Sequence, residues 1–570
     1  MPKIEVFQDA LFARMGEKLS DSELESLLEC AKAELDDVDN ENGLFKIELN
    51  DTNRPDLWST AGLARQLSVY RKFRPAPQYH FFARPGEKPD AAYRIVVDPS
   101  VEKIRPYIVG FAVSGSPVNE AELNDIIQTQ EKLCWNFGQK RKAIAMGVYR
   151  LDLINFPVKY AAVNPDKQRF QPLGLDSEMT MRQMLSDHPK GQEFGSIVAD
   201  FPSYPLLTDA EGDVLSFPPI INSNRIGAVE VGDRELFVEL TGTDMQSLLL
   251  AASIVACDFS DVGFTIHPAQ VEYPYDTPFG RTVQVPMYFQ QPQRISLEDA
   301  NSLLGSNVSA EEAVQALERM GVEATHDNGD IEIRPPEYRN DFLHGVDIAE
   351  DIMIGRGMDS FAPEMPRDFS VGRLTAVEET GRQVKSLMVG LGFQEMIFNY
   401  LGSDVDYIQR MYPEDAQEKA RNKAVQIANP MSENYAIVRP SILPSLLGAE
   451  SISAAAAFPH KIFEFGKTAR LDAQDVQGSV TENMLGWIHA DSEVDFTEVS
   501  SQLAAVLFYL GHEYHLSPAD DPRFIAGRAG NIQVDGKSIG IIGELHPRVL
   551  EQWGIRVPIT AGEMCVDFLL

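Results

Sequence analysis

The acidic segment from Asp341 to Asp351 constrains the fold of this chain more than any other feature. Asp347, Glu350 and Asp351 are spaced i, i+3 and i+4, so a helix here would carry all three on one face, with Asp341 just before or in its first turn. Like charges at this spacing repel one another and destabilise a helix. Two interpretations follow. Either the face is a solvated acidic surface, or a divalent cation lies among the carboxylates, because hard ions such as Mg²⁺ prefer oxygen ligands.

Length and composition indicate a folded protein of several domains. The 570 residues correspond to about four domains, and 44% apolar with 24% charged residues is typical of soluble folds. The longest apolar stretches fall well short of the roughly 20 residues that a membrane span needs, and the first residues lack an apolar signal core. The four cysteines are far apart and form no CxxC motif, which favours reduced thiols. Together these features predict a cytoplasmic protein.

The net charge of −35 argues against a broad nucleic-acid-binding surface, because affinity for phosphates comes mainly from Lys and Arg. An RNA partner would therefore need positive charge from a second chain or from local patches. The run Gln139-Lys140-Arg141-Lys142 is one such patch. Its alternative interpretation is an exposed turn.

The order of apolar and turn residues predicts alternating helices and strands. Apolar residues at helical spacing predict a helix from Ser20 to about Leu35. Residues 91–275 show short strands and helices in alternation, with β-branched runs at 94–97 and 108–113 that favour strands.

Residues 291–360 read as one compact unit that ends in the acidic helix. Ser296 is expected to begin a helix, and Ser309 with Glu312 forms a capping box for a second. A strand is predicted at Ile331–Arg334. The acidic helix should bury a stripe formed by Val346, Ala349 and Met353.

Several strings in the chain resemble those of one family, in the family's order: Arg339-x-Asp341 with the acids up to Asp351, Asn429-Pro430-Met431-Ser432-Glu433, Phe463-Glu464-Phe465-Gly466, and Gly543-Glu544-Leu545-His546-Pro547. On these strings the chain resembles the beta subunits of phenylalanine–tRNA ligase (phenylalanyl-tRNA synthetase) over nearly its whole length. The archaeal/eukaryotic-like type is favoured, because the bacterial type usually carries an extra oligonucleotide-binding insert and an anticodon-binding module, for which this chain lacks room.

The resemblance implies an α+β multidomain protein. Its expected parts are an N-terminal module at 1–85, a tRNA-editing domain at 90–276, a winged-helix-like magnesium-binding domain at 288–362, and a catalytic-like module at 365–570 with the antiparallel sheet of an inactive class II synthetase fold. The Phe-Arg-x-Glu string that such enzymes use for ATP is missing from the last module. No adenylation residue is therefore expected here. A separate alpha subunit would use ATP, in an (alpha-beta)₂ heterotetramer that charges tRNA(Phe).

Two sets of site residues follow from the resemblance. The implied Mg²⁺ ligands are Asp341, Asp347, Glu350 and Asp351. The implied editing site hydrolyses tyrosine mischarged onto the tRNA: Leu207 and Ser216 would shape its pocket, Glu239 would read the tyrosyl hydroxyl, and Thr241 would orient the ester or a water molecule. That branch of the family is expected to have an aspartate where this chain has Glu239.

Two rival functions belong to other classes. One is a free-standing deacylase that edits in trans, and the other is a non-catalytic scaffold that binds tRNA. Neither would charge tRNA when mixed with a smaller partner chain.

Overall fold

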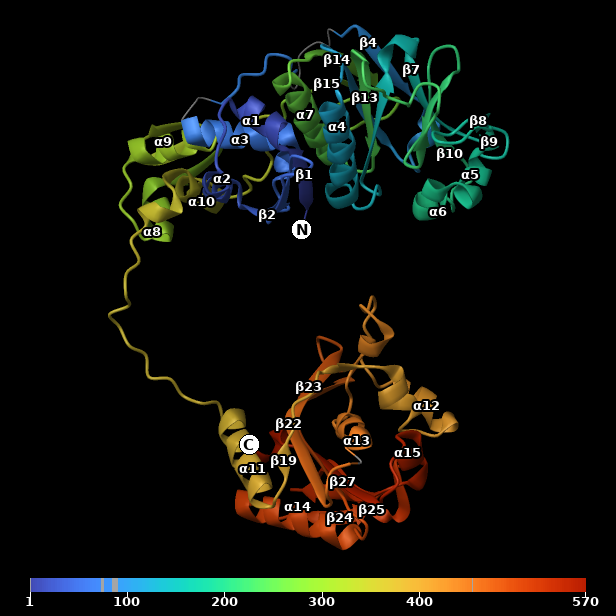
Figure 1. Cartoon of the computed structure of the whole chain (residues 1–570), viewed down its shortest axis with the longest axis vertical. Helices are drawn as coiled ribbons and strands as arrows, with labels where there is room; N and C mark the ends of the chain where they lie inside the picture. The colour runs from blue at the N-terminus through green and yellow to red at the C-terminus, as the bar shows by residue number, and fades with distance from the viewer. Residues whose placement is uncertain (1, 73–75, 85–90, 454) are drawn as a thin grey trace. The chain divides into compact units, whose positions relative to one another are not determined.

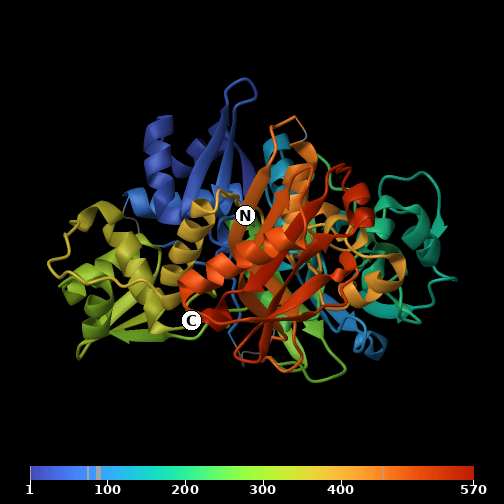
Figure 2. The ribbon, with the colours of Figure 1, turned by 90° about the horizontal axis from the view of Figure 1, so that it is seen from below.

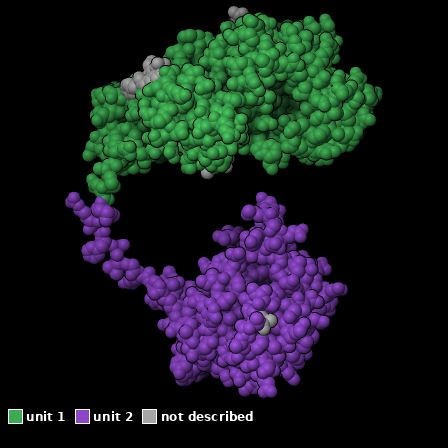
Figure 3. Space-filling view, in the orientation of Figure 1, with its two compact units in different colours: residues 1–364 green, residues 365–570 purple. Residues whose placement is uncertain are grey.

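The computed structural model describes residues 2–72, 76–84, 91–453 and 455–570. They form two compact units, residues 1–364 and 365–570 (Figure 3). Residues 85 and 90, where the N-terminal module was predicted to give way to the editing domain, lie outside the described residues.

The first unit begins with a three-stranded sheet in the order β1-β3-β2 and three helices. These elements are β1 (Lys3–Phe7), α1 (Gln8–Met15), α2 (Asp21–Leu28), β2 (Ala33–Asp39), β3 (Leu44–Leu49) and α3 (Thr60–Lys72). The predicted helix from Ser20 does start there, with a Ser20–Glu23 capping box, but α2 ends at Leu28. A 3₁₀ turn at Glu29–Ala31 follows, and the prediction is wrong beyond it because Lys32 adopts a left-handed conformation (φ 48°), which turns the chain into β2.

The centre of the first unit is a ten-stranded mixed sheet. Its strand order is β12-β11-β10-β7-β4-β14-β5-β13-β6, with β15 paired to β14. The strands are β4 (Tyr93–Val97), β5 (Tyr107–Ser114), β6 (Ile144–Arg150), β7 (Val158–Val163), β10 (Tyr204–Thr208), β11 (Val214–Phe217), β12 (Ile221–Asn222), β13 (Glu235–Gly242), β14 (Thr265–Glu272) and β15 (Thr282–Val285).

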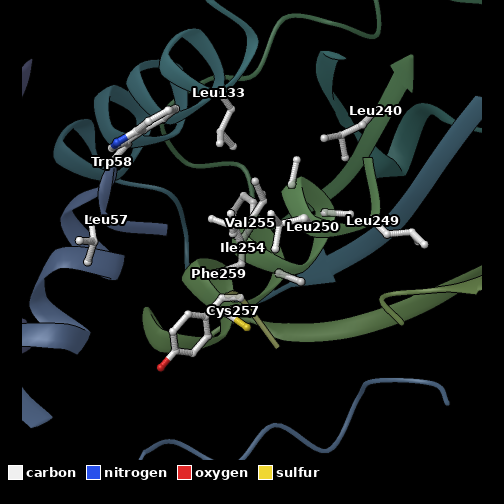
Figure 4. Close-up of a cluster of buried hydrophobic side chains, with 14 of the residues drawn as sticks. Leu57, Trp58, Leu133, Leu240, Leu249, Leu250, Ile254, Val255, Cys257 and Phe259 are labelled. Carbon is white, nitrogen blue, oxygen red and sulfur yellow. The ribbon is translucent and has the colours of Figure 1, made fainter. Parts of the chain in front are cut away.

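Helix α7 (Met245–Asp261) joins this sheet to the N-terminal elements. It is apolar almost all round, which is typical of a helix buried on every side. Its side chains share one buried cluster with Leu57 and Trp58, which precede α3, and with Leu240 of β13 (Figure 4). The N-terminal elements and the sheet therefore fold as one body.

Another helix, α4 (Glu120–Lys132), begins at an Asn119–Glu122 capping box and runs into a π-helical turn at Leu133–Phe137.

A small group of four elements lies beside β10 (Figures 1 and 2). It consists of the hairpin β8 (Arg169–Phe170) and β9 (Met179–Thr180) with helices α5 (Met181–Asp187) and α6 (Pro189–Phe194), and it has its own apolar cluster around Phe170, Met184 and Phe194.

The last part of the first unit is a three-stranded sheet in the order β16-β18-β17 with three helices. These are β16 (Gln293–Ser296), α8 (Leu297–Leu304), α9 (Ala310–Arg319), β17 (Glu323–Asp327), β18 (Asp330–Arg334) and α10 (Gly345–Arg356). The predicted caps at Ser296 and Ser309 are confirmed. The predicted buried stripe of α10 is confirmed at Ala349 and wrong at Val346, which is exposed; Ile348 and Ile352 also face the core.

The second unit is built on a seven-stranded sheet in the order β19-β22-β23-β27-β26-β25-β24, antiparallel except for β19 and β22. Its strands are β19 (Gln394–Glu395), β22 (His460–Leu471), β23 (Ser479–Ala490), β24 (His515–Pro518), β25 (Phe524–Val534), β26 (Lys537–Leu545) and β27 (Ile559–Cys565), with a small pair β20 (Leu401–Gly402) and β21 (Ile437–Val438). Its helices are α11 (Ala376–Gly390), α12 (Glu414–Arg421), α13 (Leu443–Ile452), α14 (Phe496–Leu510) and α15 (Pro547–Gln552).

The whole is a mixed α and β protein of several parts, as predicted. Among the residues described, no helix combines the length and the apolar character that crossing a bilayer requires.

Candidate functional site

A cleft of about 370 Å³ opens in the first unit where the two ends of the ten-stranded sheet meet. One wall comes from β6, at one end of the strand order, and the other from β11 and β12, at the opposite end. Side chains of α4 complete the lining, including Leu123, Ile126 and Gln130. The lining is mainly apolar with a few polar groups, which is the usual character of a small-ligand site.

Glu239 reaches the cleft from the centre of β13, where Gly110 and Gly147 are its neighbours on the two adjacent strands. Its side chain is only 2% exposed. A glycine at position 147 is required sterically, because a Cβ there would lie 2.1 Å from the Tyr149 hydroxyl oxygen. The glycine therefore leaves room for the phenol of Tyr149 beside the carboxyl group.

Tyr149 bridges the two walls of the cleft. Its hydroxyl donates to Ser216 Oγ at 2.8 Å and also lies 3.4 Å from Glu239 Oε2. Burial raises the pKa of Glu239 to about 8, because the charge of Arg105, the Tyr149 hydroxyl and the Gly147 N–H only partly offset desolvation. At neutral pH the Glu239 carboxyl is therefore mostly protonated, so it both donates and accepts hydrogen bonds.

Leu207 and Thr241 are not part of the cleft lining. Leu207 is the cross-strand partner of Ser216 and is fully buried. Thr241 is also buried, and its Oγ1 accepts a hydrogen bond from Nε of Arg105 at 2.9 Å. Of the four predicted editing residues, the structure thus brings Ser216 and Glu239 together in the cleft lining and leaves the other two outside it.

The acidic segment 341–351 is organised around one arginine. The guanidinium of Arg339 donates to both oxygens of Asp341, at 3.0 and 2.6 Å, and to both oxygens of Asp351, at 2.6 and 3.2 Å. Arg339 is 2% exposed, and it also lies over the ring of Phe342 at 4.2 Å. A single buried cation therefore engages all four carboxylate oxygens of these two residues.

The other two acids have different partners. Asp347 Oδ2 accepts from the backbone N–H groups of Leu343 and His344, both at 2.7 Å, so it caps the start of α10. Glu350 Oε1 pairs with Lys32 Nζ at 2.6 Å.

This geometry departs from the prediction of one cation shared by Asp341, Asp347, Glu350 and Asp351. Within the described residues, no three His, Cys, Asp or Glu side chains gather as a metal site. The physical reason is that Arg339 and Lys32 already neutralise three of the four acids. The four residues do not fit Mg²⁺ in this arrangement of the chain.

Comparison with known proteins covers both units. Residues 1–72 match a model described as the Phe-tRNA synthetase beta subunit B1 domain, 293–358 match the tRNA synthetase B5 domain, and 363–566 match the phenylalanyl tRNA synthetase beta chain CLM domain. The beta subunits of phenylalanine–tRNA ligase from Borrelia hermsii and Borrelia turicatae are each 45% identical over 571 residues, covering 100% of both chains. The chain belongs to the phenylalanyl-tRNA synthetase beta-subunit family.

A solved structure in this family covers much of the first unit. The N-terminal fragment of the beta subunit from Pyrococcus horikoshii is 34% identical with a TM-score of 0.59, covering 62% of this chain and all of that fragment.

The archaeal/eukaryotic-like type is not supported, because these full-length relatives come from bacteria. That prediction relied on the lack of room for extra bacterial modules. The Borrelia beta subunits align with this chain from end to end, so chain length does not separate the types.

Sequence reasoning did not identify Tyr149 or Arg105 as parts of this beta-subunit site. Tyr149 had a detectable signal, since Ala145, Gly147 and Tyr149 alternate along one strand and therefore share one face. Arg105 had none, because its link to Thr241 spans 136 residues of sequence.

Proposed function

We propose that this chain is the beta subunit of a phenylalanine–tRNA ligase, and that its cleft removes tyrosine mischarged onto tRNA(Phe). With an alpha subunit that uses ATP, in an (alpha-beta)₂ heterotetramer, it attaches phenylalanine to the tRNA. The observation that carries the editing role is the buried, largely neutral carboxyl of Glu239 in an apolar cleft beside two hydroxyl groups.

Tyrosine differs from phenylalanine by one hydroxyl. A merely apolar pocket rejects such an analogue by only about 10²-fold, so a second site must read the hydroxyl. A protonated carboxyl matches a phenol well, because each group both donates and accepts a hydrogen bond. Glu239 suits this task and, unlike a charged carboxylate, needs no cation in the cleft.

The remaining editing residues act through these groups. Ser216 shares the hydroxyl network of Tyr149 and shapes the pocket directly. Leu207 shapes it indirectly, by packing beside Ser216 as its strand partner. Thr241, which is held by a hydrogen bond from Arg105, is assigned the orientation of the ester or the attacking water.

The four parts of the chain receive the roles that the family suggests. Residues 1–85 are an N-terminal module, 90–276 the editing domain, 288–362 a winged-helix-like domain, and 365–570 a class II synthetase-like module without adenylation residues. The last module supports an alpha partner, because it exposes large apolar side chains such as Ile397, Phe508 and Tyr509.

The ligase role is tested by mixing the purified chain with an alpha subunit. Phenylalanine should be attached to tRNA(Phe) by the mixture and by neither chain alone. A mixture that charges no tRNA would leave the rival scaffold or the free-standing deacylase as the better interpretation.

The editing role is tested on tyrosyl-tRNA(Phe). Glu239→Leu should slow release of tyrosine by about 10- to 100-fold, the value of one or two hydrogen bonds to a buried polar group. Glu239→Gln keeps a donor and an acceptor and should retain more activity, and Tyr149→Phe should fall between them. Equal rates for wild type and Glu239→Leu would contradict the assignment.

A further inference from the structure

We infer that the segment Trp135–Lys142 is a docking site for the single-stranded 3′ end of an RNA that enters the cleft. Trp135 stacks on a base, and Lys140 and Lys142 contact phosphates. This inference rests on the proposed editing function and names the surface that would receive its substrate.

The segment carries a local excess of basic residues in an acidic chain. The chain has 85 acidic and 50 basic residues. Residues 132–151 nevertheless contain five basic residues and no acidic one. A local basic stretch in a strongly acidic protein is a specific location for phosphate groups rather than part of a general positive field.

The backbone of the segment is held in an unfavourable conformation. Gln139, Lys140 and Arg141 are consecutive non-glycine residues in the left-handed region, with φ of 52°, 55° and 67°. Each such residue costs roughly 1 kcal/mol or more, and strain of this kind is concentrated at binding sites. The preceding residues form a π-helical turn, which is also frequent at functional sites.

Arg141 anchors this strained turn to the cleft. Its Nη1 donates to the carbonyl oxygens of Pro219 and Ile220 at 3.1 and 3.0 Å, and the residue lines the cleft. Lys140 and Lys142 flank this cleft residue in the sequence, and both are exposed. The carbonyl of Lys142 accepts from Arg105, which also contacts Thr241, so the turn is coupled to the strand that carries Glu239.

Trp135 supplies the aromatic surface. It is 45% exposed, which is unusual for so large an apolar ring. One edge packs on Phe194 with ring centroids 6.2 Å apart, and Lys140 Nζ lies 5.2 Å from the centroid of the Trp135 ring. A rigid exposed ring beside cations is the combination that binds single-stranded nucleic acid, since every base has a face for stacking.

The size of the cleft favours an RNA end over other partners. A volume of about 370 Å³ accommodates an aminoacyl group and adjoining atoms but no duplex. The phosphates that follow must then lie outside the cleft, where Lys140 and Lys142 are exposed.

The test is binding of a fluorescent single-stranded oligoribonucleotide ending in CCA to the full chain, followed by anisotropy. Trp135→Ala should weaken binding by about 5- to 150-fold, the range for removal of one stacked base. Lys140→Gln/Lys142→Gln should weaken it and lower the slope of log affinity against log salt by about 1.4, or 0.7 for each phosphate that is no longer neutralised. The matched control is Lys103→Gln/Lys159→Gln, which removes two exposed lysines that do not line the cleft.

Unchanged binding in Trp135→Ala and Lys140→Gln/Lys142→Gln, with thermal unfolding like that of wild type, would overturn the inference. So would an equal loss of affinity in the control, or equally good binding of an acidic peptide. These readouts need no hydrolysis. A wild-type protein that binds the RNA at this turn but releases no tyrosine would refute the editing function and leave the docking site standing.

Discussion

Single residues determine the chemistry of the cleft, and Glu239 is the one whose protonation state matters most. Its neutral form depends on burial rather than on a nearby acid. A carboxyl that is protonated in the folded state and ionised in the unfolded state makes folding stability depend on pH.

The sign of that dependence follows from the pKa values. The pKa of Glu239 rises from an ordinary 4.5 to about 8 on folding. The contribution of this carboxyl to the free energy of unfolding is therefore fully present below about pH 4.5 and is lost as pH rises through 8. In the wild type, the free energy of unfolding should fall by up to about 1.4 kcal/mol for each pH unit in this window. Glu239→Gln should abolish this decrease. Thermal unfolding of both proteins from pH 5 to 9 measures it. Glu235→Gln, an exposed position on the same strand, is the control; a wild type and a Glu239→Gln variant with parallel pH profiles would contradict the prediction.

Sequence reasoning reached Ser216 and Glu239 but not the contacts that make them a site. Strand residues in family strings can be located from their neighbours along the chain. The Tyr149–Ser216 and Arg105–Thr241 hydrogen bonds join residues 67 and 136 positions apart, so only the folded sheet brings them together. The acids near α10 show the same limit: their spacing is visible in sequence, but the direction in which Arg339 points is not.

At the scale of elements, the start of α10 depends on the ion-pair network of Arg339, Asp341 and Asp351. Burying two carboxylates is costly unless a cation and hydrogen bonds compensate them, and Arg339 supplies both. The ion pairs of Arg339 therefore hold the segment before α10 against the helix itself, which is a structural role.

Removing Arg339 alone should consequently be severe. Arg339→Met leaves both aspartates buried without a partner and should lower the free energy of unfolding by about 3–5 kcal/mol. Urea denaturation measures this decrease. Adding Asp341→Asn and Asp351→Asn to Arg339→Met should restore part of it, because no charge then remains buried.

Arg281→Met is the control for this experiment. It breaks an exposed pair with Asp276 and should change stability by less than about 1 kcal/mol. Arg339→Met protein that regains wild-type stability in Mg²⁺ would contradict the argument, since the acids would then act as metal ligands once the arginine is gone.

At the scale of the whole molecule, the chain consists of two units that each have their own core. The first holds the cleft and the Arg339 network, and the second holds the seven-stranded sheet with two apolar clusters. The sequence predicted a boundary at 362–365 from the resemblance, and the compact units separate after residue 364.

The connection between the units should be the preferred site of proteolysis. Residues 365–374 are all exposed and belong to no helix or strand, and they include Arg367 and Arg373. Proteases need an extended segment free of buried contacts, so brief trypsin treatment should cut after one of these arginines. Mass spectrometry should then find fragments ending or beginning within 367–374, and Arg367→Gln/Arg373→Gln should abolish that cut.

The N-terminal fragment should keep its fold after separation. The reason is that the crystal structure of an N-terminal fragment of the Pyrococcus horikoshii beta subunit matches 62% of this chain, so a fragment of this kind folds without the rest of its chain. Loss of its thermal unfolding transition after cleavage would show that the first unit needs the second to stay folded.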